Sequence, residues 1–175
     1  MKRPHMAGAI AVRDATRALP IRIRRARLAD EPAAAAVSAH AFASVRGVYQ
    51  PMTASPPTVT ASGERLVRWV AQREGEVLGT VRCRFEPHRL HLIGLAVHPS
   101  FQRRGVARAI VEHLGRVAGR RGLPRLSLYT IRQTGNAIVF ERLGFQIVSE
   151  TPAEGAISPI GEELTELYME RRVFT

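Results

Sequence analysis

The residues with the clearest chemical potential lie in a short basic segment that follows an apolar run. The apolar run covers residues 90–97, and the basic segment reads Gln102, Arg103, Arg104, Gly105, Val106, Ala107 and Arg108. A helix that begins near Gly105 presents backbone N–H groups without intrahelical acceptors, and its dipole favours an anion there. Gly105 has no Cβ to keep a phosphate from the backbone, and the three arginines add positive charge. The pattern predicts a pyrophosphate-binding loop, and a solvated basic helix end is the alternative that these residues leave open.

The loop matches neither of two widespread nucleotide-binding patterns, because G-x-G-x-x-G and G-x-x-x-x-G-K-[ST] are both absent. It resembles instead the Q/R-x-x-G-x-G/A signature of the GCN5-related N-acetyltransferase (GNAT) family. The residues L-A-V-x-P precede the loop, and Asn136 with F-E-R-L-G-F at 140–145 follows it, similar to N…Y-E-x-L-G-F in that family. The resemblance covers residues 21–175.

The resemblance implies a single α/β domain over residues 21–175. Its sheet is expected to be mixed and mostly antiparallel, with six to seven strands, flanking helices and a splay between the fourth and fifth strands. Acetyl-CoA is expected in the splay as the acyl donor. The resemblance then implies that backbone groups of Leu95, Ala96 and Val97 bind the pantetheine arm, and that residues 102–108 bind the pyrophosphate. A backbone N–H near Leu95 would polarise the thioester carbonyl.

Asn136 resembles the family asparagine that contacts the donor near its pantetheine end. Two alternatives stay open. Asn136 can simply cap its own helix, or the equivalent place can belong to Gln133, because some relatives have the asparagine three residues earlier.

The main departure from the family pattern is Phe140, where many relatives have a tyrosine that protonates the departing thiolate. Tyr129, at the end of the expected fifth strand, is the nearest substitute, and a strand-end aromatic with its hydroxyl in water is the alternative. The attacking amine must lose a proton to a base. His91 matches the position of the base in some relatives, and an unperturbed histidine pKa near 6.5 suits proton removal. A structural histidine is the alternative there. The weaker candidates around the site are His98, Glu86 and Tyr168.

The resemblance predicts an enzyme that moves acetyl from acetyl-CoA to a primary amine, of a small molecule or a protein, by direct attack in a ternary complex. Acceptor choice in this fold depends on the segments that here span Gly47–Gly63 and Thr151–Glu163. One alternative is a CoA-binding sensor without chemistry, which Phe140 would allow. Another is a basic nucleic-acid-binding protein, but aromatic residues are only 6% and no RNP-like, zinc or KH signature occurs. A homodimer is common among relatives, although no segment marks an interface.

The elements that must position these residues follow from periodicity and turn signals. Strands are expected at 21–24, 67–73, 77–85, 90–97, 126–129, 145–148 and 164–172. Helices are expected at 33–42, 105–120 and 135–143. Asp30 is expected to cap the first helix, and Gly144 to end the third. Residues 1–20 are interpreted as a loose basic extension, with Met6 as an alternative start.

Length and composition fit one globular domain of 175 residues. No apolar stretch approaches the roughly 20 residues of a membrane span, and no signal peptide is evident, so a cytoplasmic location is expected. Lys2 is the only lysine among 26 basic residues, and the net charge of +11 predicts an anionic partner. Cys83 is expected to be buried and inert. The six histidines lack metal-ligand spacing, so no metal is expected.

Overall fold

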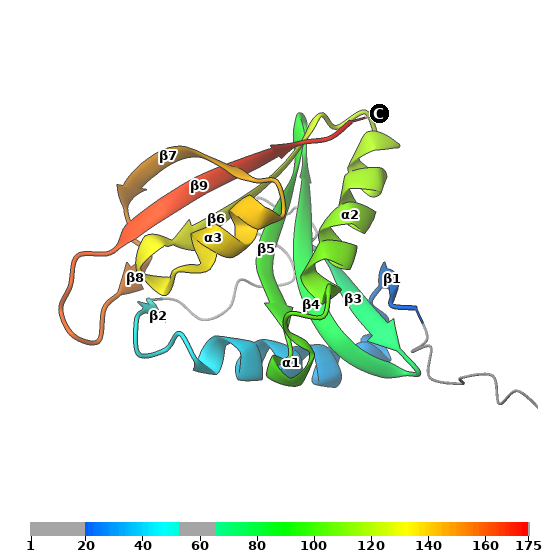
Figure 1. Ribbon diagram of the computed structural model, residues 1–175, viewed down its shortest axis with the longest axis horizontal. Helices are drawn as coiled ribbons and strands as arrows, with labels where there is room; N and C mark the ends of the chain where they lie inside the picture. Colours follow the sequence, from blue (N-terminus) through cyan, green and yellow to red (C-terminus); the bar gives the residue numbers. More distant parts are fainter. Residues whose placement is uncertain (1–19, 53–65, 175) are drawn as a thin grey trace, which may run out of the picture.

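The computed structural model describes residues 20–52 and 66–174. The strands of its main sheet are β1 Arg22–Arg25, β3 Val67–Arg73, β4 Glu76–Glu86, β5 Arg89–Val97, β6 Arg125–Ile131, β7 Gln146–Pro152 and β9 Thr165–Arg172. They lie in the order β1-β3-β4-β5-β6-β9-β7 (Figure 1), and every neighbouring pair is antiparallel except β5 and β6. This mixed sheet confirms the expected fold class. The expected extension, apart from Pro20, lies outside the described residues, and so does Met6.

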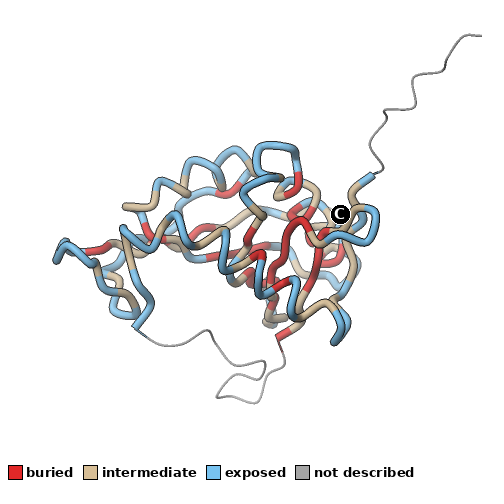
Figure 2. The backbone as a smooth tube through the Cα atoms, turned by 90° about the horizontal axis from the view of Figure 1, so that it is seen from below, coloured by how far each residue is buried: buried red, intermediate tan, exposed pale blue. Residues whose placement is uncertain are grey.

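Within these residues three α-helices flank the sheet, α1 Glu31–Ala43, α2 Val106–Gly119 and α3 Asn136–Arg142. Apolar residues recur along α2 at helical spacing, and the buried ones pack in one core cluster with β4, β5, β6 and β9. The red positions in Figure 2 mark this interior, whereas the edge strand β7 is exposed along its whole length. None of the helices within the described residues is long and apolar enough to cross a membrane.

Alternation along β4 separates the two faces of the sheet. A Cβ on Gly79 would lie 3.0 Å from Val106 Cγ1, so this residue faces α2. Thr80 and Arg82 point the other way, toward the face that α1 covers. There Arg68, which pairs with Arg82 in the β3–β4 register, forms an ion pair with Glu31 at 3.1 Å. The face of the sheet that α1 covers is therefore polar near that helix, whereas the face toward α2 forms the main hydrophobic core.

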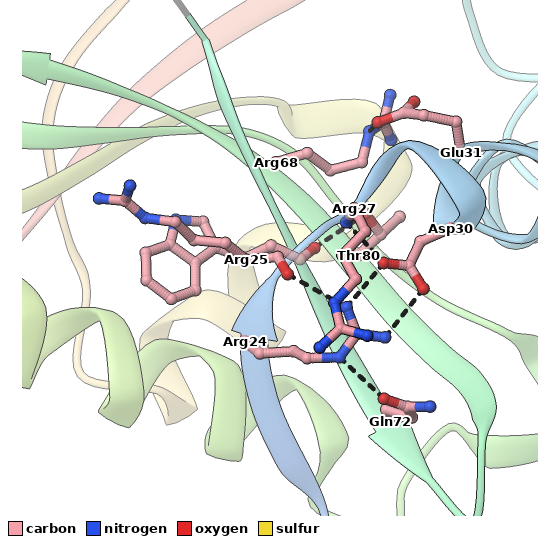
Figure 3. Close-up of polar contacts among 9 residues, drawn as sticks. Arg24, Arg25, Arg27, Asp30, Glu31, Arg68, Gln72 and Thr80 are labelled. Carbon is pink, nitrogen blue, oxygen red and sulfur yellow. Dashed lines mark hydrogen bonds and ion pairs between the residues drawn. The ribbon is translucent and has the colours of Figure 1, made fainter.

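The helix α1 is joined to β1 through Asp30, which stands at its N-cap position as expected but does not cap the helix. Its carboxylate accepts hydrogen bonds from Arg24 Nη1 at 2.6 Å, Arg24 Nη2 at 2.8 Å and the backbone N–H of Arg27 at 2.6 Å (Figure 3). The Arg24 guanidinium, which also donates from Nε to Gln72 Oε1 at 2.9 Å, holds the pKa of Asp30 well below its usual value. The expected capping role was wrong because a bidentate charged partner binds the carboxylate more strongly than a helix N–H does.

The parallel strands β5 and β6 separate after a short pairing. Their register runs only from Leu90 opposite Leu126 to Leu92 opposite Leu128, although β5 continues to Val97 and β6 to Ile131. These are the fourth and fifth strands of the expected order, and their parting matches the expected splay.

A β-bulge in β5 begins where the splay opens. Thr80 pairs with Ala96 and Arg82 with Ile93, so β5 carries one residue more than β4 over this interval. Gly94 lies within it at φ 62°, a conformation that glycine adopts without steric cost. The bulge bends β5 at the place where its pairing with β6 has ended.

Most element boundaries fall within a few residues of the expected ones. The structure adds a two-stranded ladder that no periodicity marked, β2 Gln50–Pro51 paired with β8 Ala156–Ile157. It also adds three short 3₁₀ turns, η1 Leu28–Asp30, η2 Pro99–Phe101 and η3 Arg132–Thr134. The ladder joins two segments that are far apart in sequence.

Candidate functional site

The basic loop turns sharply between η2 and α2. Gln102 is extended, Arg103 has φ 60°, and Gly105 has φ 80° as the N-cap residue of α2, with no side chain capping the helix. The loop is anchored at its base because Gln102 Nε2 donates to the Val97 carbonyl at 3.1 Å, and the His98 N–H donates to the Leu78 carbonyl at 2.9 Å. The first N–H groups of α2 are thus free of side-chain caps, as an anion-binding helix start requires.

The space around this loop fits a phosphate group. A Cβ added to Gly105 would meet no atom within 4 Å, so the glycine opens onto free space rather than onto packed protein. Arg103, Arg104 and Arg108 are exposed beside it, whereas Val106 is 2% exposed and anchors the helix start in the core. The loop therefore combines an anchored base, backbone donors and exposed positive charge at one surface.

A cleft of about 230 Å³ occupies the splay between β5 and β6. Its walls come from α1, β5, β6, α3, the β7–β8 turn and β9. They include Phe42, Leu92, Gly94, Leu95, Leu128, Tyr129, Ile131, Asn136, Phe140, Gly155 and Glu166. The cleft therefore brings together Leu95, Tyr129 and Asn136, three residues that the sequence marked from separate segments.

Leu95 lines this cleft, and Ala96 and Val97 continue β5 toward the basic loop without being part of the cleft lining. Ala96 pairs with Thr80 and Val97 with Gly79 in β4, while pairing with β6 has already ended at Leu92. The edge of β5 that faces the splay thus resembles a sheet edge, which an extended ligand can join by β-type hydrogen bonds. Ala96 is 2% exposed, and the side chains of Leu95 and Val97 pack against the core.

Asn136 and Gln133 have different surroundings. Gln133 Nε2 donates to the Glu163 carbonyl and its Oε1 accepts from the Thr165 N–H, both at 3.1 Å, so this amide ties η3 to the start of β9. Asn136 follows the N-cap residue Gly135, and its side chain caps nothing. It lines the cleft instead, and Asn136 is therefore the better placed of the two to contact a ligand there.

Tyr129 and His91 are neighbours at the wall of the cleft, but their environments differ. Tyr129 is 50% exposed and lines the cleft, whereas His91 is 5% exposed and lies behind it with ring centroids 5.3 Å apart. His91 Nδ1 hydrogen-bonds Ser127 Oγ at 2.9 Å. Burial lowers the pKa of His91 to about 4, so its imidazole is neutral at pH 7. The unperturbed pKa near 6.5 that favoured a base role from the sequence is therefore wrong for His91, because burial disfavours the protonated imidazole and makes it a weaker base. The neutral imidazole still has a nitrogen that can accept a proton.

The weaker candidates from the sequence lie away from the cleft wall. Burial alone would raise the pKa of Glu86, but hydrogen bonds from Arg89 and Arg84 lower it overall. Tyr168 accepts from Arg89 Nη1 and donates to Glu170 Oε1, each at 2.6 Å, and its ring lies 5.0 Å from that of Tyr129.

The third weaker candidate, His98, has its ring centroid 5.1 Å from that of His40 in α1, with the two rings tilted by 55°. Cys83 is fully buried as expected, and burial raises the pKa of its thiol.

Sequence reasoning missed Glu166 and Gly94, which both line the cleft. Glu166 had a signal, because β9 alternates polar residues at 166, 168 and 170 with Leu167 and Met169, which are buried. The only sequence signal for Gly94 was the presence of a glycine inside an apolar strand, a pattern that often marks a β-bulge. Within residues 20–52 and 66–174, no group of three or more His, Cys, Asp or Glu side chains is placed to hold a metal ion.

Comparison with known proteins gives a family and a set of similar folds. Residues 39–145 match the model of the acetyltransferase (GNAT) family. An acetyltransferase of Pectobacterium atrosepticum is 33% identical over 81 residues, which are 45% of this chain and 57% of that protein. The match therefore spans little more than half the length of that curated relative.

Solved structures resemble the chain over most of its length. The ribosomal-protein-S18-alanine N-acetyltransferase from Escherichia coli is 23% identical with a TM-score of 0.67, over 89% of this chain and 96% of that one. A GCN5-related N-acetyltransferase from Kribbella flavida is also 23% identical with a TM-score of 0.67, over 87% and 97%. The PaiA N-acetyltransferase from Thermoplasma acidophilum, solved in complex with coenzyme A, is 12% identical with a TM-score of 0.63, over 88% and 99%. At these identities the likeness establishes the fold.

Proposed function

The chain belongs to the acetyltransferase (GNAT) family, and from that premise we propose that it transfers an acetyl group from acetyl-CoA to a primary amine by direct attack in a ternary complex. One observation carries the proposal. The splay of β5 and β6, with its open strand edge, lies next to a left-handed Gly105 loop that leads into α2. An extended thioester arm and a pyrophosphate require these two features side by side.

The donor is held in the proposal mainly by backbone groups. Amides of residues 103–108 bind the pyrophosphate at the start of α2, with Gln102 bracing the loop against Val97. The edge of β5 at Leu95–Val97 pairs with the pantetheine arm, and Asn136 contacts it from α3. A backbone N–H at Leu95 stabilises the oxyanion that develops on the thioester carbonyl. Acetyl-CoA supplies the acetyl group in activated form.

The reaction needs two proton movements, because the amine loses a proton when its bond to the acetyl carbon forms and the departing thiolate gains one. We assign the second to Tyr129, whose hydroxyl makes no hydrogen bond within the described residues and lies on the cleft wall. We assign the first to His91, which is neutral and contacts the Tyr129 ring from behind. Because His91 is buried, its proton path to the cleft runs past Tyr129 and requires that side chain to move.

The acceptor is proposed to enter on the side of the β2–β8 ladder, between the segments Gly47–Gly63 and Thr151–Glu163. Residues 53–65 of the first segment lie outside the described residues. The second segment carries Glu154, Glu162 and Glu163, which suit a cationic acceptor. This acidic loop stands out in a chain with a net charge of +11.

The test is calorimetric titration with CoA and acetyl-CoA, followed by a thiol-release assay with a panel of amines. The decisive variant is Gly105→Val, because a side chain there would occupy the open space that we assign to phosphate. Gly122→Val is the matched control, since Gly122 is also left-handed at φ 68° and open to solvent, but follows the C-terminal end of α2.

We expect Gly105→Val to weaken CoA binding at least about tenfold, the loss of roughly one charge-assisted hydrogen bond, and Gly122→Val to leave it unchanged. CoA binding without thiol release on any amine would favour a sensor that binds CoA without chemistry. Absence of CoA binding in the wild type would overturn the proposal and return attention to nucleic acid as the anionic partner.

A further inference from the structure

Glu166 is the one carboxylate among the described residues that line the cleft. It is half-buried on β9, and burial raises its pKa. Its carboxylate makes no hydrogen bond and no ion pair within the described part of the chain. The other half-buried acids on this face are partnered, Glu86 by Arg84 and Arg89, and Glu170 by Arg125 and Tyr168.

An unpaired, half-buried carboxylate costs stability, because it loses hydration and gains no cation. The cost stands out in a chain that holds 26 basic residues, since an arginine partner would remove it. A side chain kept in this state at the wall of a cleft is suited to bind a cation that arrives with a ligand.

The strand register places Glu166 relative to the reacting end of the cleft. Continuing the β5–β6 register beyond Leu92 and Leu128, with allowance for the extra residue of the β5 bulge, brings Leu95 level with Thr130 or Ile131, and Ile131 pairs with Glu166. Glu166 is therefore two strands across from Leu95. At roughly 4.8 Å per strand spacing, and more across the splay, the two backbones are about 10 Å apart or more.

Two roles for the carboxylate differ in what they predict. A carboxylate that takes up the proton of the attacking amine is needed for every amine, whereas one that binds a second cation matters only for acceptors that carry that cation. A second charged group, several bonds from the reacting amine, is within reach. The Tyr129 ring, which lines the same cleft, offers an aromatic face to that second cation.

We propose that Glu166 binds a second positive charge of the acceptor, so that the preferred substrates are diamines or longer amines with a further ammonium group. This inference rests on the proposed function and deepens it, since it names the acceptor class. Glu166 acts in recognition and does not take part in the proton transfers.

The test compares 1,4-diaminobutane with butylamine, which have the same carbon chain and differ by one ammonium group. Wild type, Glu166→Gln and Glu112→Gln are assayed by thiol release. Both variants remove one negative charge, but Glu112 is exposed on α2 and outside the cleft wall. The wild type is expected to favour the diamine. Glu166→Gln should lower kcat/KM for the diamine by about 10- to 100-fold, mainly through KM, the equivalent of one hydrogen bond to a charged group.

Butylamine turnover and the KM for acetyl-CoA should stay nearly constant in Glu166→Gln, and Glu112→Gln should behave as wild type. If Glu166→Gln keeps the diamine preference, or if the wild type has none while acetylating amines, the inference is overturned and the transferase assignment stands. Calorimetric binding of 1,4-diaminobutane to the CoA-loaded protein adds a readout that needs no turnover. Weaker binding in Glu166→Gln alone supports the inference even without thiol release, and equal or absent binding overturns it.

Discussion

At the scale of single residues, the wall of the cleft pairs a half-exposed tyrosine with a buried histidine. His91 owes its depressed pKa chiefly to burial, and its Nδ1 is held by Ser127. At equilibrium His91 is therefore neutral over most of the range in which free histidine titrates. This state has a consequence for the fold as well as for proton transfer.

We expect acid to destabilise the protein partly through His91. The unfolded histidine has a pKa near 6.5 and the folded one about 4, so as pH falls between these values the unfolded chain takes up the proton first. The stabilisation is full above pH 6.5 and is lost progressively toward pH 4, by up to about 3 kcal/mol. Urea unfolding as a function of pH measures it.

The variant that checks this is His91→Gln, which should flatten the pH dependence of the unfolding free energy in that window. His88→Gln removes an exposed histidine and should not. Part of the pH dependence of the unfolding free energy should remain in His91→Gln because of His113, whose pKa is lowered by burial and then by Arg116 and Arg120. An unchanged slope in His91→Gln would show that His91 does not titrate as described.

Tyr129 can be tested by removing only its hydroxyl. If Tyr129 protonates the thiolate, Tyr129→Phe should lower kcat about 100-fold and leave the KM for acetyl-CoA unchanged. Adding Phe140→Tyr should restore part of the rate, because the ring of Phe140 lines the same cleft. Steady-state thiol release measures both effects. A wild-type kcat in Tyr129→Phe would mean that water supplies the proton.

At this scale the alternation around Cys83 predicted its burial, which the structure confirms. Asn136 lines the cleft, and its contact with the donor stays a prediction. Which of Asn136 and Gln133 is better placed to contact a ligand depends on tertiary contacts, because the Gln133 side-chain amide hydrogen-bonds the backbone of Glu163 and Thr165. Glu166 was missed for the same reason, since its isolation from cations exists only in the folded chain.

At the scale of elements, long periodic segments were predictable and short ones were not. The core face of α2 and the alternation of β4 follow directly from side-chain spacing, as their packing confirms. The two-residue strands β2 and β8 carry no periodicity, and long-range pairing alone creates them. Asp30 was predicted at the right place with the wrong partner, because Arg24 reaches it from another element.

Substitution by alanine should change the free energy of unfolding in opposite directions at Gly79 and Gly115. A Cβ on Gly79 would lie 3.0 Å from both the Ala96 carbonyl oxygen and Val106 Cγ1, where β4, β5 and α2 meet. Gly79→Ala should therefore lower the free energy of unfolding by about 1–3 kcal/mol through overpacking. Gly115 lies inside α2 with no atom near its added Cβ, so Gly115→Ala should raise it by about 0.5–1 kcal/mol.

Chemical denaturation of both variants measures these changes. Because Gly79 also supports the segment Ala96–Val97, its alanine variant should weaken CoA binding, whereas Gly115→Ala should not. A neutral Gly79→Ala would show that β5 and α2 can shift apart without loss.

At the scale of the whole molecule, the net charge of +11 acts on any anionic ligand, but distance and salt limit how much each arginine contributes. Screening acts over about 10 Å at moderate salt. Arg104 and Arg108 lie beside the loop, whereas Arg116 and Arg120 lie near the far end of α2, roughly 15–20 Å along the helix at 1.5 Å per residue.

We expect the double variant Arg104→Gln with Arg108→Gln to weaken CoA binding about three- to tenfold at low salt, and less at about 1 M salt, where screening is nearly complete. The matched double variant Arg116→Gln with Arg120→Gln should change it less than about twofold. Calorimetry over a salt series measures both. Equal losses in the two double variants would mean that the overall charge, rather than the loop, attracts the ligand.

The ladder between β2 and β8 has a consequence for how such a protein changes over evolutionary time. Gln50 and Pro51 pair with Ile157 and Ala156, and the Met52 N–H donates to the Gly155 carbonyl at 3.0 Å. The ladder thus fastens together the two segments to which acceptor choice is assigned. An insertion or deletion in one would displace the other, so we expect the two segments to change together. Grafting a single loop from a relative would break the ladder, and transplanting both together would preserve it.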